Sequence, residues 1–461
     1  MANKSLITNG AKISQVEQVY YSPVAVVPPN ISVPLGTLYC FLAKVDAWPT
    51  DSNPPVPTQD VKSLKTIFKN MFAVKHITSN DISPVIKRVN WESGVTYDAY
   101  SDTVDMFELD TNGNSIKNFY IKNRYDQVFK CLWNNNEDAS TVEPYFEPGT
   151  FSTNNIFQGA DNYKWKYMFT IDTGSKLKFM DATWIPVPVG SNTPNALQTS
   201  AGAGAIEVIN ILDGGALYDP SNSAISVVIT GDGTGASGTA VVVGNAITDV
   251  VVNTPGSNYT YANVSFSTSS GFGAIVSSPT SPVGGHGFNP ISELGCHHVM
   301  ISAEFKGGEG GIIPTDIDYH QVGLVSNPTT KSLFETYGND YVPASGSIYK
   351  TTTDFVVSPG FGVYTQDEFF YQGDSPATAS FIGTILSFDE ASNVVRVLNM
   401  SGTPSLNAPI KGYTTSTTRT LLSYSEPDFS IFSGYINIIE NRSGVSRSSD
   451  GIEQYKFVLG Y

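Results

Sequence analysis

The chain has 461 residues, and its 26 Lys and Arg residues are outnumbered by 42 Asp and Glu residues, which gives a net charge of −16. Binding to a phosphate backbone requires Lys and Arg to replace its counterions, so this balance argues against a nucleic-acid partner. No apolar run approaches the roughly 20 residues that span a bilayer, and the N-terminus lacks the apolar core of a secretory signal. We therefore expect no membrane partner and synthesis in a cytoplasm.

The composition favours strands over long helices. Charged residues make up only 15% of the chain, while Gly (41), Pro (27), Tyr (24) and Phe (25) are plentiful. Aromatic side chains pack well on a sheet, and Gly and Asn supply tight turns. We predict a mainly β fold with a few helices (α+β), arranged as a multidomain, β-sandwich-like architecture of about three domains.

The first 57 residues are expected to be mostly extended, with a strand over residues 38–45 and a stiff Pro-rich loop over 48–57. An amphipathic helix is predicted near residues 58–76, because apolar side chains recur there every three or four positions. Thr58 or Asp60 can cap its first turn. The apolar stripe consists of Val61, Leu64, Phe68, Met71 and Val74.

Residues 84–188 are predicted to form strands and turns. Asn112-Gly113 suggests a hairpin between residues 104–109 and 116–121. Residues 164–171 alternate large apolar and polar side chains, which is typical of a half-buried strand.

Residues 191–280 shift toward Gly, Ala, Ser, Thr and Val, and they contain an internal duplication. Residues 206–218 align with 247–259, which places Tyr218 and Tyr259 41 positions apart. Each copy continues into a short β run and then Gly-x-Gly-Ala, at 233–236 and 271–274. Neither copy can bury a face alone, so we expect the two copies to pack on one another as an inserted β module.

Three segments follow from this pattern. Residues 1–190 form a β-rich N-terminal part, 191–280 the insert and 281–461 a C-terminal β part that could pack with residues 1–90. The last part includes a β run at 297–305 and a hairpin made from 381–386 and 393–398.

Three apparent chemical motifs have simpler explanations. Residues 233–238 match G-x-G-x-x-G, but a β run follows instead of the helix that holds a pyrophosphate, so a turn is expected. Residues 110–115 resemble part of a calcium loop whose twelfth position is Ile121 rather than Glu, so a hairpin turn is expected. The three cysteines Cys40, Cys131 and Cys296 show no metal spacing and are expected to be reduced thiols.

A metal site at Cys296, His298 and His320 stays open, although structural histidines are favoured because nothing in the spacing demands a site. His286, His297, Asp316 and Asp318 are the neighbouring groups that such a site could recruit. We find no hydrolase elbow, zinc-protease motif or Walker loop. The sequence thus predicts neither a cofactor nor an enzyme.

Aromatic residues gather between residues 119 and 167. Core packing is the favoured explanation, and a protein interface is the alternative because Tyr and Trp anchor interfaces well. The interface candidates are Tyr120, Tyr125, Trp133, Tyr163, Trp165 and Tyr167.

These aromatic segments carry a resemblance to a known family. Residues 119–135 (FYIKNRYDQVFKCLWNN), 163–171 (YKWKYMFTI) and 184–187 (WIPV) resemble the dimeric baseplate wedge subunit of contractile-tailed bacteriophages. Shorter matches occur at residues 48–55, 70–75, 91–98, 293–302 and 319–328. The resemblance covers roughly residues 38–190 and 286–330, and it is lost at the insert and over much of 331–461.

The resemblance implies a mainly β structural protein of the virion tail baseplate. Such a subunit has no catalytic residues, pairs with itself as a homodimer and docks onto other wedge proteins. The alternative is a host-surface or carbohydrate-binding tail protein that uses exposed aromatic side chains of the insert for glycan binding.

Overall fold

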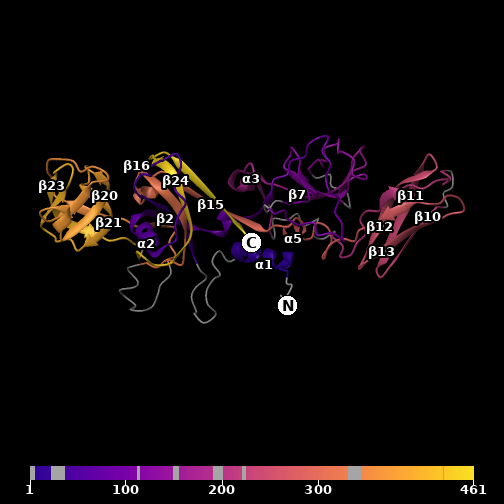
Figure 1. The fold of residues 1–461 in the computed structure, drawn as a ribbon, viewed down its shortest axis with the longest axis horizontal. Coiled ribbons are helices and arrows are strands. Elements are labelled where there is room, and N and C mark those ends of the chain that lie inside the picture. The colour runs from indigo at the N-terminus through magenta and orange to yellow at the C-terminus, as the bar shows by residue number, and fades with distance from the viewer. Residues whose placement is uncertain are drawn as a thin grey trace. The chain divides into compact units, whose positions relative to one another are not determined.

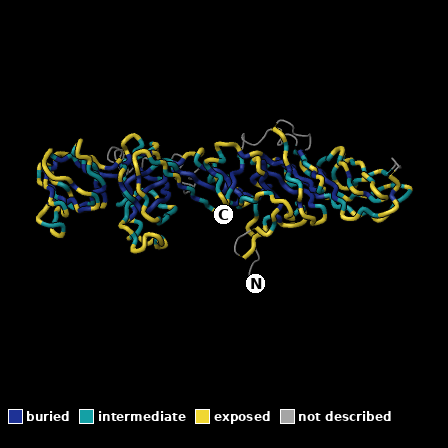
Figure 2. Tube along the Cα trace, turned by 90° about the horizontal axis from the view of Figure 1, so that it is seen from above, coloured by how far each residue is buried: buried dark blue, intermediate teal, exposed yellow. Residues whose placement is uncertain are grey.

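The computed structural model describes most of the chain. The described residues are 6–21, 37–111, 115–148, 155–189, 201–220, 225–330, 344–428 and 430–461. Strands account for 44% of the structure and helices for 11%, which confirms the mainly β, multidomain α+β prediction. Figure 1 shows the elements and Figure 2 shows buried segments running through both parts of the fold.

The chain forms two compact units. One, the insert-bearing unit, contains residues 1–17, 83–300 and 458–461, and the other, the barrel-bearing unit, contains residues 18–82 and 301–457. The two units do not correspond to the three consecutive segments expected from the sequence. Residues 18–82 fold with the C-terminal part of the chain, which agrees with the expectation that residues 1–90 could pack with 281–461. Helix α1 (Asn9–Tyr21) falls in a region expected to be extended, where only Ile13 and Val16 are buried.

The first sheet of the barrel-bearing unit has the strand order β17-β2-β1-β16-β24. Its strands are β1 (Leu38–Ala43), β2 (Met71–Ile77), β16 (Ile317–Ser326), β17 (Ile348–Lys350) and β24 (Tyr435–Arg447). Helix α2 (Val61–Asn70) precedes β2, and Ile67 and Phe68 of this helix join the core of the sheet. The predicted strand at 38–45 is thus confirmed as β1.

The predicted helix at 58–76 is too long. Asp60 caps α2 by accepting hydrogen bonds from the backbone of Lys62 and Ser63, but the helix ends at Asn70 and Met71 begins β2. The first four residues of β2 are all buried, so this strand lacks the alternating pattern that separates a strand from a helix. The apolar spacing therefore ran from the helix into the strand without a visible break.

A closed six-stranded barrel completes this unit, with the order β18-β21-β20-β19-β22-β23 (Figure 1). Its strands are β18 (Thr353–Val357), β19 (Phe369–Gln372), β20 (Phe381–Asp389), β21 (Val394–Gly402), β22 (Pro409–Gly412) and β23 (Thr418–Ser425). The predicted hairpin is confirmed as β20 and β21, which pair from Phe381 and Gly402 to Asp389 and Val394. Phe355, Phe370 and Phe381 fill the barrel core.

Another sheet has the order β25-β15-β3-β8, and the chain passes from one unit to the other within β3, β15 and β25. Its strands are β3 (Ile82–Lys87), β8 (Trp184–Pro186), β15 (His298–Lys306) and β25 (Ile452–Gly460). Short helical segments complete the framework: η1 (Ser79–Asp81), α3 (Thr173–Phe179), α5 (Pro290–Glu293), η3 (Glu309–Gly311) and η4 (Pro376–Thr378).

The aromatic sheet lies in the insert-bearing unit and has the order β4-β5-β7-β6. Its strands are β4 (Tyr120–Lys122), β5 (Gln127–Trp133), β6 (Ile156–Gln158) and β7 (Lys164–Thr170), so the strand predicted at 164–171 is confirmed. The hairpin predicted around Asn112-Gly113 is shorter than expected. Leu109 and Ser115 make a single bridge, residues 104–109 form no strand, and residues 112–114 lie outside the described part.

The insert forms a four-stranded sheet, β12-β11-β10-β13, and a two-stranded ribbon, β9-β14. Its strands are β9 (Asn210–Asp213), β10 (Ser226–Gly231), β11 (Thr234–Val243), β12 (Ala246–Ser257), β13 (Ala262–Ser267) and β14 (Ile275–Ser277). Strand β11 begins at Thr234 and contains Gly235 and Gly238, so the turn predicted at residues 233–238 is wrong for 234–238. These glycines lie in a strand and no helix follows them, so the arrangement is not that of a dinucleotide loop.

The two copies of the duplication interlock. Ile206 N donates to Pro255 O and Ile247 N donates to Gly214 O, which are equivalent bonds under the 41-residue offset. Each tyrosine also packs on the Gly-x-Gly-Ala of the other copy. A Cβ at Gly271 would lie 2.4 Å from the Tyr218 ring, and one at Gly233 would lie 2.4 Å from the Tyr259 ring. The predicted packing of the two copies on one another is confirmed. The tyrosine of each copy packs on the glycines of the other copy.

We predict that Gly233→Ala loosens the insert. The new Cβ would meet the Tyr259 ring and, at 2.6 Å, Ser257 O, and overpacking of this kind costs about 1–3 kcal/mol. Hydrogen exchange of residues 226–267 should become faster and the melting temperature should fall. Gly360→Ala is the matched control, because its Cβ comes no closer than 3.9 Å to Arg419. Equal stability of the two variants would contradict the interlocked packing.

Candidate functional site

One face of the aromatic sheet is a closed core. Tyr163 and Trp165 stack with ring centroids 5.4 Å apart, and Tyr97 meets Trp165 edge-on at 5.5 Å. Phe129 and Tyr167 complete the cluster, and Tyr163 Oη donates to Asp138 O. Alternation along β5 and β7 places these rings on one face and lysines on the other.

The six interface candidates do not form one surface. Tyr120, Trp133, Tyr163, Trp165 and Tyr167 are all buried within their own chain. A buried side chain cannot contact a partner, so the interface prediction is wrong for these five positions and core packing is correct. Sequence could not separate the two, because the same large aromatic residues serve both environments.

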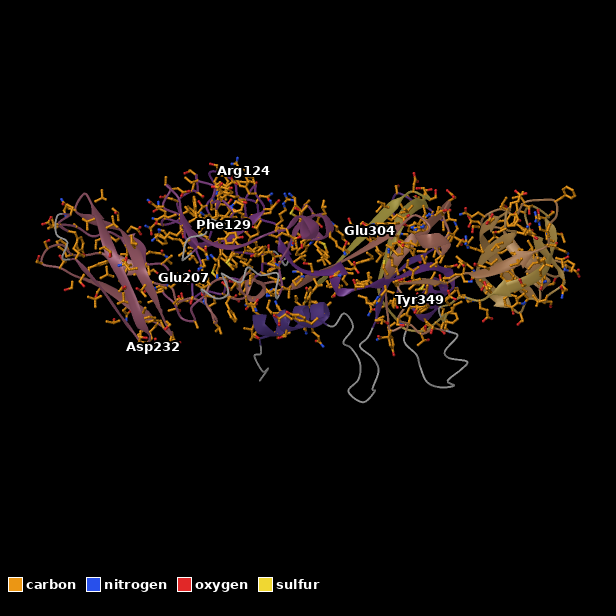
Figure 3. The ribbon with its side chains drawn as sticks, turned by 180° about the vertical axis from the view of Figure 1, so that it is seen from behind. Arg124, Phe129, Glu207, Asp232, Glu304 and Tyr349 are labelled. Carbon is orange, nitrogen blue, oxygen red and sulfur yellow. The ribbon has the colours of Figure 1, made fainter. Side chains whose placement is uncertain are left out.

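Tyr125 is the exception, with 52% of its surface exposed. Its ring lies 4.4 Å from that of Tyr145, which is 37% exposed. Asn123 Oδ1 accepts from the backbone of Tyr125 and Gln127, and Glu143 accepts from Arg124 N. Figure 3 shows Arg124 at the periphery of the sheet and Phe129 inside it. The exposed tyrosine pair is therefore held on a rigid turn.

The opposite face of the sheet carries buried cations, which we call the lysine face: Lys130, Lys164 and Lys166. Lys130 of β5 and Lys166 of β7 are direct cross-strand partners. Like charges at such positions repel each other, and burial removes the water that would screen them. Each lysine therefore requires a carboxylate, and each has one.

Lys130 is compensated within the sheet's own unit by the α5 region. Its Nζ lies 3.5 Å from Glu293 Oε2, 3.2 Å from His286 Nδ1 and 4.0 Å from the centroid of the Tyr100 ring. Only 1% of the Lys130 side chain and 3% of the Glu293 side chain are exposed. This cation is enclosed on all sides by an acid, an imidazole and an aromatic ring.

Lys164 and Lys166 are compensated by the insert. Lys166 Nζ lies 2.6 Å from Glu207 Oε2, and Lys164 Nζ lies 2.7 Å from Asp249 Oδ1. Glu207 lies between the strands of the insert and those of the aromatic sheet in Figure 3. The sequence contains no Lys or Arg from residue 179 to residue 305, so every cation in this contact comes from the framework. The charged groups that the insert supplies here are carboxylates.

Burial and charge act against each other at this site. Burial lowers the pKa of Lys130, and Glu293 opposes that change. Burial would raise the pKa of Glu293, but Lys130 and His286 outweigh it and hold that pKa below its ordinary value. Burial, followed by Lys130, lowers the pKa of His286, which keeps this imidazole neutral near pH 7. Lys130, His286 and Glu293 thus form a compensated buried cluster beneath the sheet.

The cysteines and histidines do not gather into a metal centre within the described residues. Cys296 Sγ is buried and donates to Val85 O, and the His298 ring lies 4.5 Å from that of Trp184. His320 Nε2 lies 3.3 Å from Asp51 Oδ1. Each of these groups has a separate structural environment.

The lysine face is not predicted from the sequence, although a signal for it exists. Lys164 and Lys166 alternate with Tyr163, Trp165 and Tyr167, and such alternation is typical of a half-buried strand with a solvent-facing polar side. The absence of Lys and Arg from residues 179–305 would have identified the insert as the source of the compensating carboxylates.

Comparison with known proteins adds no family. No protein-family model and no curated protein matches the sequence. In the part of the chain that the structure describes, none of the helices has the length and apolar character needed to cross a membrane.

We predict that Lys166→Met destabilises the insert-bearing unit strongly. Removal of one partner leaves Glu207 charged and buried, which typically costs about 3–5 kcal/mol. The double variant Lys166→Met/Glu207→Leu should recover most of that loss. Urea denaturation followed by tryptophan fluorescence measures both effects.

Lys306→Met is the matched control for this experiment. Lys306 pairs with Glu304 on the surface, with 62% of its side chain exposed, so its removal should change stability far less than loss of Lys166 does. Equal effects of the two single substitutions would show that the buried pair does not hold the unit together.

A pH dependence follows from His297. Burial, followed by the charge of Lys12, lowers its pKa to about 4. In the unfolded chain this histidine binds a proton near pH 6.5, whereas in the folded chain it does so only near pH 4. The free energy of unfolding therefore falls as pH decreases from about 6.5 to 4, by at most about 1.4 kcal/mol per pH unit. In the variant His297→Gln, the melting temperature should fall less between pH 8 and this window than it does in the unaltered chain. An unchanged slope would contradict this assignment.

Proposed function

We propose that the chain is a non-enzymatic structural subunit of a bacteriophage contractile-tail baseplate wedge. It pairs with itself and docks onto neighbouring wedge proteins during baseplate assembly. The virion tail baseplate is its proposed location.

The observation that carries this proposal is the position of the family-like sequence in the fold. Residues 119–135 and 163–171 supply β5 and β7, which carry both the aromatic core and the lysine face. Residues 319–328 supply most of β16, the strand between β1 and β24. The resemblance thus covers framework strands in both units, where a shared fold would be encoded, while the insert is an addition to that framework.

The insert's attachment also supports a mechanical role. Separation of Lys166 from Glu207 would leave buried charges without partners, so this pair resists movement of the insert. The partly exposed pair Lys164–Asp249 adds a second point of attachment. Asn210 Nδ2 adds a hydrogen bond to Leu132 O of β5. A subunit that must pass a rearrangement to its neighbours benefits from modules that do not pivot freely.

A second candidate is glycan binding by the insert, with or without a place in the baseplate. Tyr261 and Phe272 are 57% and 65% exposed, and flat aromatic surfaces stack on sugar rings. A glycan array probed with the full chain, with Tyr261→Ala and Phe272→Ala as comparisons, tests this candidate. Binding that persists in both variants, or no binding, would leave the insert as a spacer or lateral contact.

Antibody labelling of tailed particles tests the baseplate proposal. Gold-labelled antibodies raised against the purified chain should mark the baseplate ring of particles in electron micrographs. Co-expression with wedge proteins should yield a stable complex that contains two copies of this chain. Label at the capsid or tail tube, or a monomer that binds no wedge protein, would overturn the proposal.

A further inference from the structure

The segment that leaves the insert is tied to the segment that enters it. Ser281 N donates to Ala205 O at 3.0 Å, and Ser281 Oγ accepts from Ala205 N and donates to Gly202 O. Gly285 packs against the same backbone, because a Cβ there would lie 2.5 Å from Gly202 N. Residues 281–289, which we call the exit segment, therefore form one joint with the entry of the insert.

His286 anchors the exit segment in the interior. Its side chain is 2% exposed, and its ring meets that of Tyr100 edge-on, with the centroids 4.9 Å apart. Tyr100 Oη donates to Thr280 O, and Asp102 accepts from both Thr280 N and Thr280 Oγ1. Movement of this imidazole would therefore disturb the residue at which the insert ends.

The position of Lys130 requires a neutral imidazole. Lys130 Nζ lies 3.2 Å from His286 Nδ1, and an ammonium group only donates, so this ring nitrogen must accept. In a protonated imidazole both ring nitrogens are donors. Protonation of His286 would therefore break this hydrogen bond and leave two cations facing each other.

Both carboxylate oxygens of Glu293 are already engaged. Glu293 Oε2 lies 3.5 Å from Lys130 Nζ and 3.5 Å from His286 Nδ1, so the two nitrogens share one oxygen. Glu293 Oε1 accepts from the backbone of Gly287 and Asn289. A second cation beside Lys130 would have to compete with it for the same acceptor.

The buried charges balance only while His286 is neutral. Lys130 and Lys166 face Glu293 and Glu207, which gives two positive and two negative charges. Glu207 favours a charged imidazole, as Glu293 does, but Glu207 Oε2 lies 2.6 Å from Lys166 Nζ. A third cation would have no carboxylate of its own, and a buried charge without a partner is strongly disfavoured.

We propose that His286 is an acid-sensitive latch, whose protonation releases the exit segment and loosens the joint between the entry and exit of the insert. The exit segment yields before the sheet does, because Val283 is fully exposed and Phe288 is 48% exposed, whereas Lys130 belongs to the paired strand β5. The proposal goes beyond the baseplate role and does not depend on it, because the latch is a property of the purified chain.

Hydrogen exchange of the unaltered full chain, followed by mass spectrometry from pH 8 to pH 4, tests the latch. Protection is expressed relative to an unstructured peptide at the same pH, which removes the intrinsic pH dependence of exchange. Release binds one proton, so protection of residues 201–205 and 281–293 should fall at least about fivefold from pH 7 to pH 5, and no more than about tenfold per pH unit. Strands β10 to β13 of the insert should keep their protection over the same range.

His286→Gln separates the latch from other titrating groups. The glutamine amide offers Lys130 an acceptor but binds no proton, so most of the pH dependence in these two segments should disappear. His76→Gln is the matched control, because His76 is a partly buried histidine of β2 in the barrel-bearing unit. It should leave the fall in protection unchanged.

Three outcomes of the exchange experiment would overturn the proposal: equal pH dependence in all three chains, constant protection of the unaltered chain down to pH 4, or loss of protection in β10 to β13 together with the exit segment. If His286→Gln does not fold, NMR titration of the unaltered chain with isotope-labelled histidine replaces it. A midpoint for the His286 ring below about pH 6.5 supports the latch, and one at or above that pH contradicts it.

Discussion

The pairing of β5 with β7 imposes the strongest constraint on the insert-bearing unit. Their register sets Lys130 opposite Lys166 on a face that the fold buries. Two adjacent buried ammonium groups cannot persist without anions at hydrogen-bonding distance, because desolvation of each costs several kcal/mol. The sheet cannot turn its lysines toward solvent, because that rotation would expose Tyr163 and Trp165 on its aromatic face. Glu293 and the insert's carboxylates are therefore required by the sheet, and the position of the insert follows from them.

The interlocked duplication explains how one small module meets that requirement. Glu207 belongs to the first copy and Asp249 to the second, and the exchanged bonds at Ile206 and Ile247 make the two copies inseparable. Both carboxylates thus arrive on a single rigid body, and the lysine face contacts both copies. A module with free halves would have to order each carboxylate separately, at the cost of more conformational entropy.

Sequence reasoning succeeded where local pattern decides structure and failed where pairing partners decide it. The strand at β7, the hairpin of β20 and β21, the cap at Asp60 and the duplication all follow from spacing within short segments. The end of α2 at Asn70 did not, because the first four residues of β2, Met71–Val74, are all buried and show no strand alternation. Barrel closure pairs β18 with β23, from Asp354 and Ser425 to Val357 and Leu421, so it depends on residues far apart in the chain. The hydrogen bond from Asn441 Nδ2 to Pro55 O joins residues 386 positions apart. No single-segment pattern contains such contacts.

The interior charges also change how the net charge should be understood. Within the described residues, six cationic side chains are buried against three acidic ones: Lys122, Lys130, Lys164, Lys166, Arg419 and Arg447 against Glu207, Glu293 and Glu368. The interior therefore holds an excess of positive charge, and the surface is more acidic than −16 indicates. An acidic surface repels copies of itself except where uncharged patches meet, and it attracts basic segments of other chains.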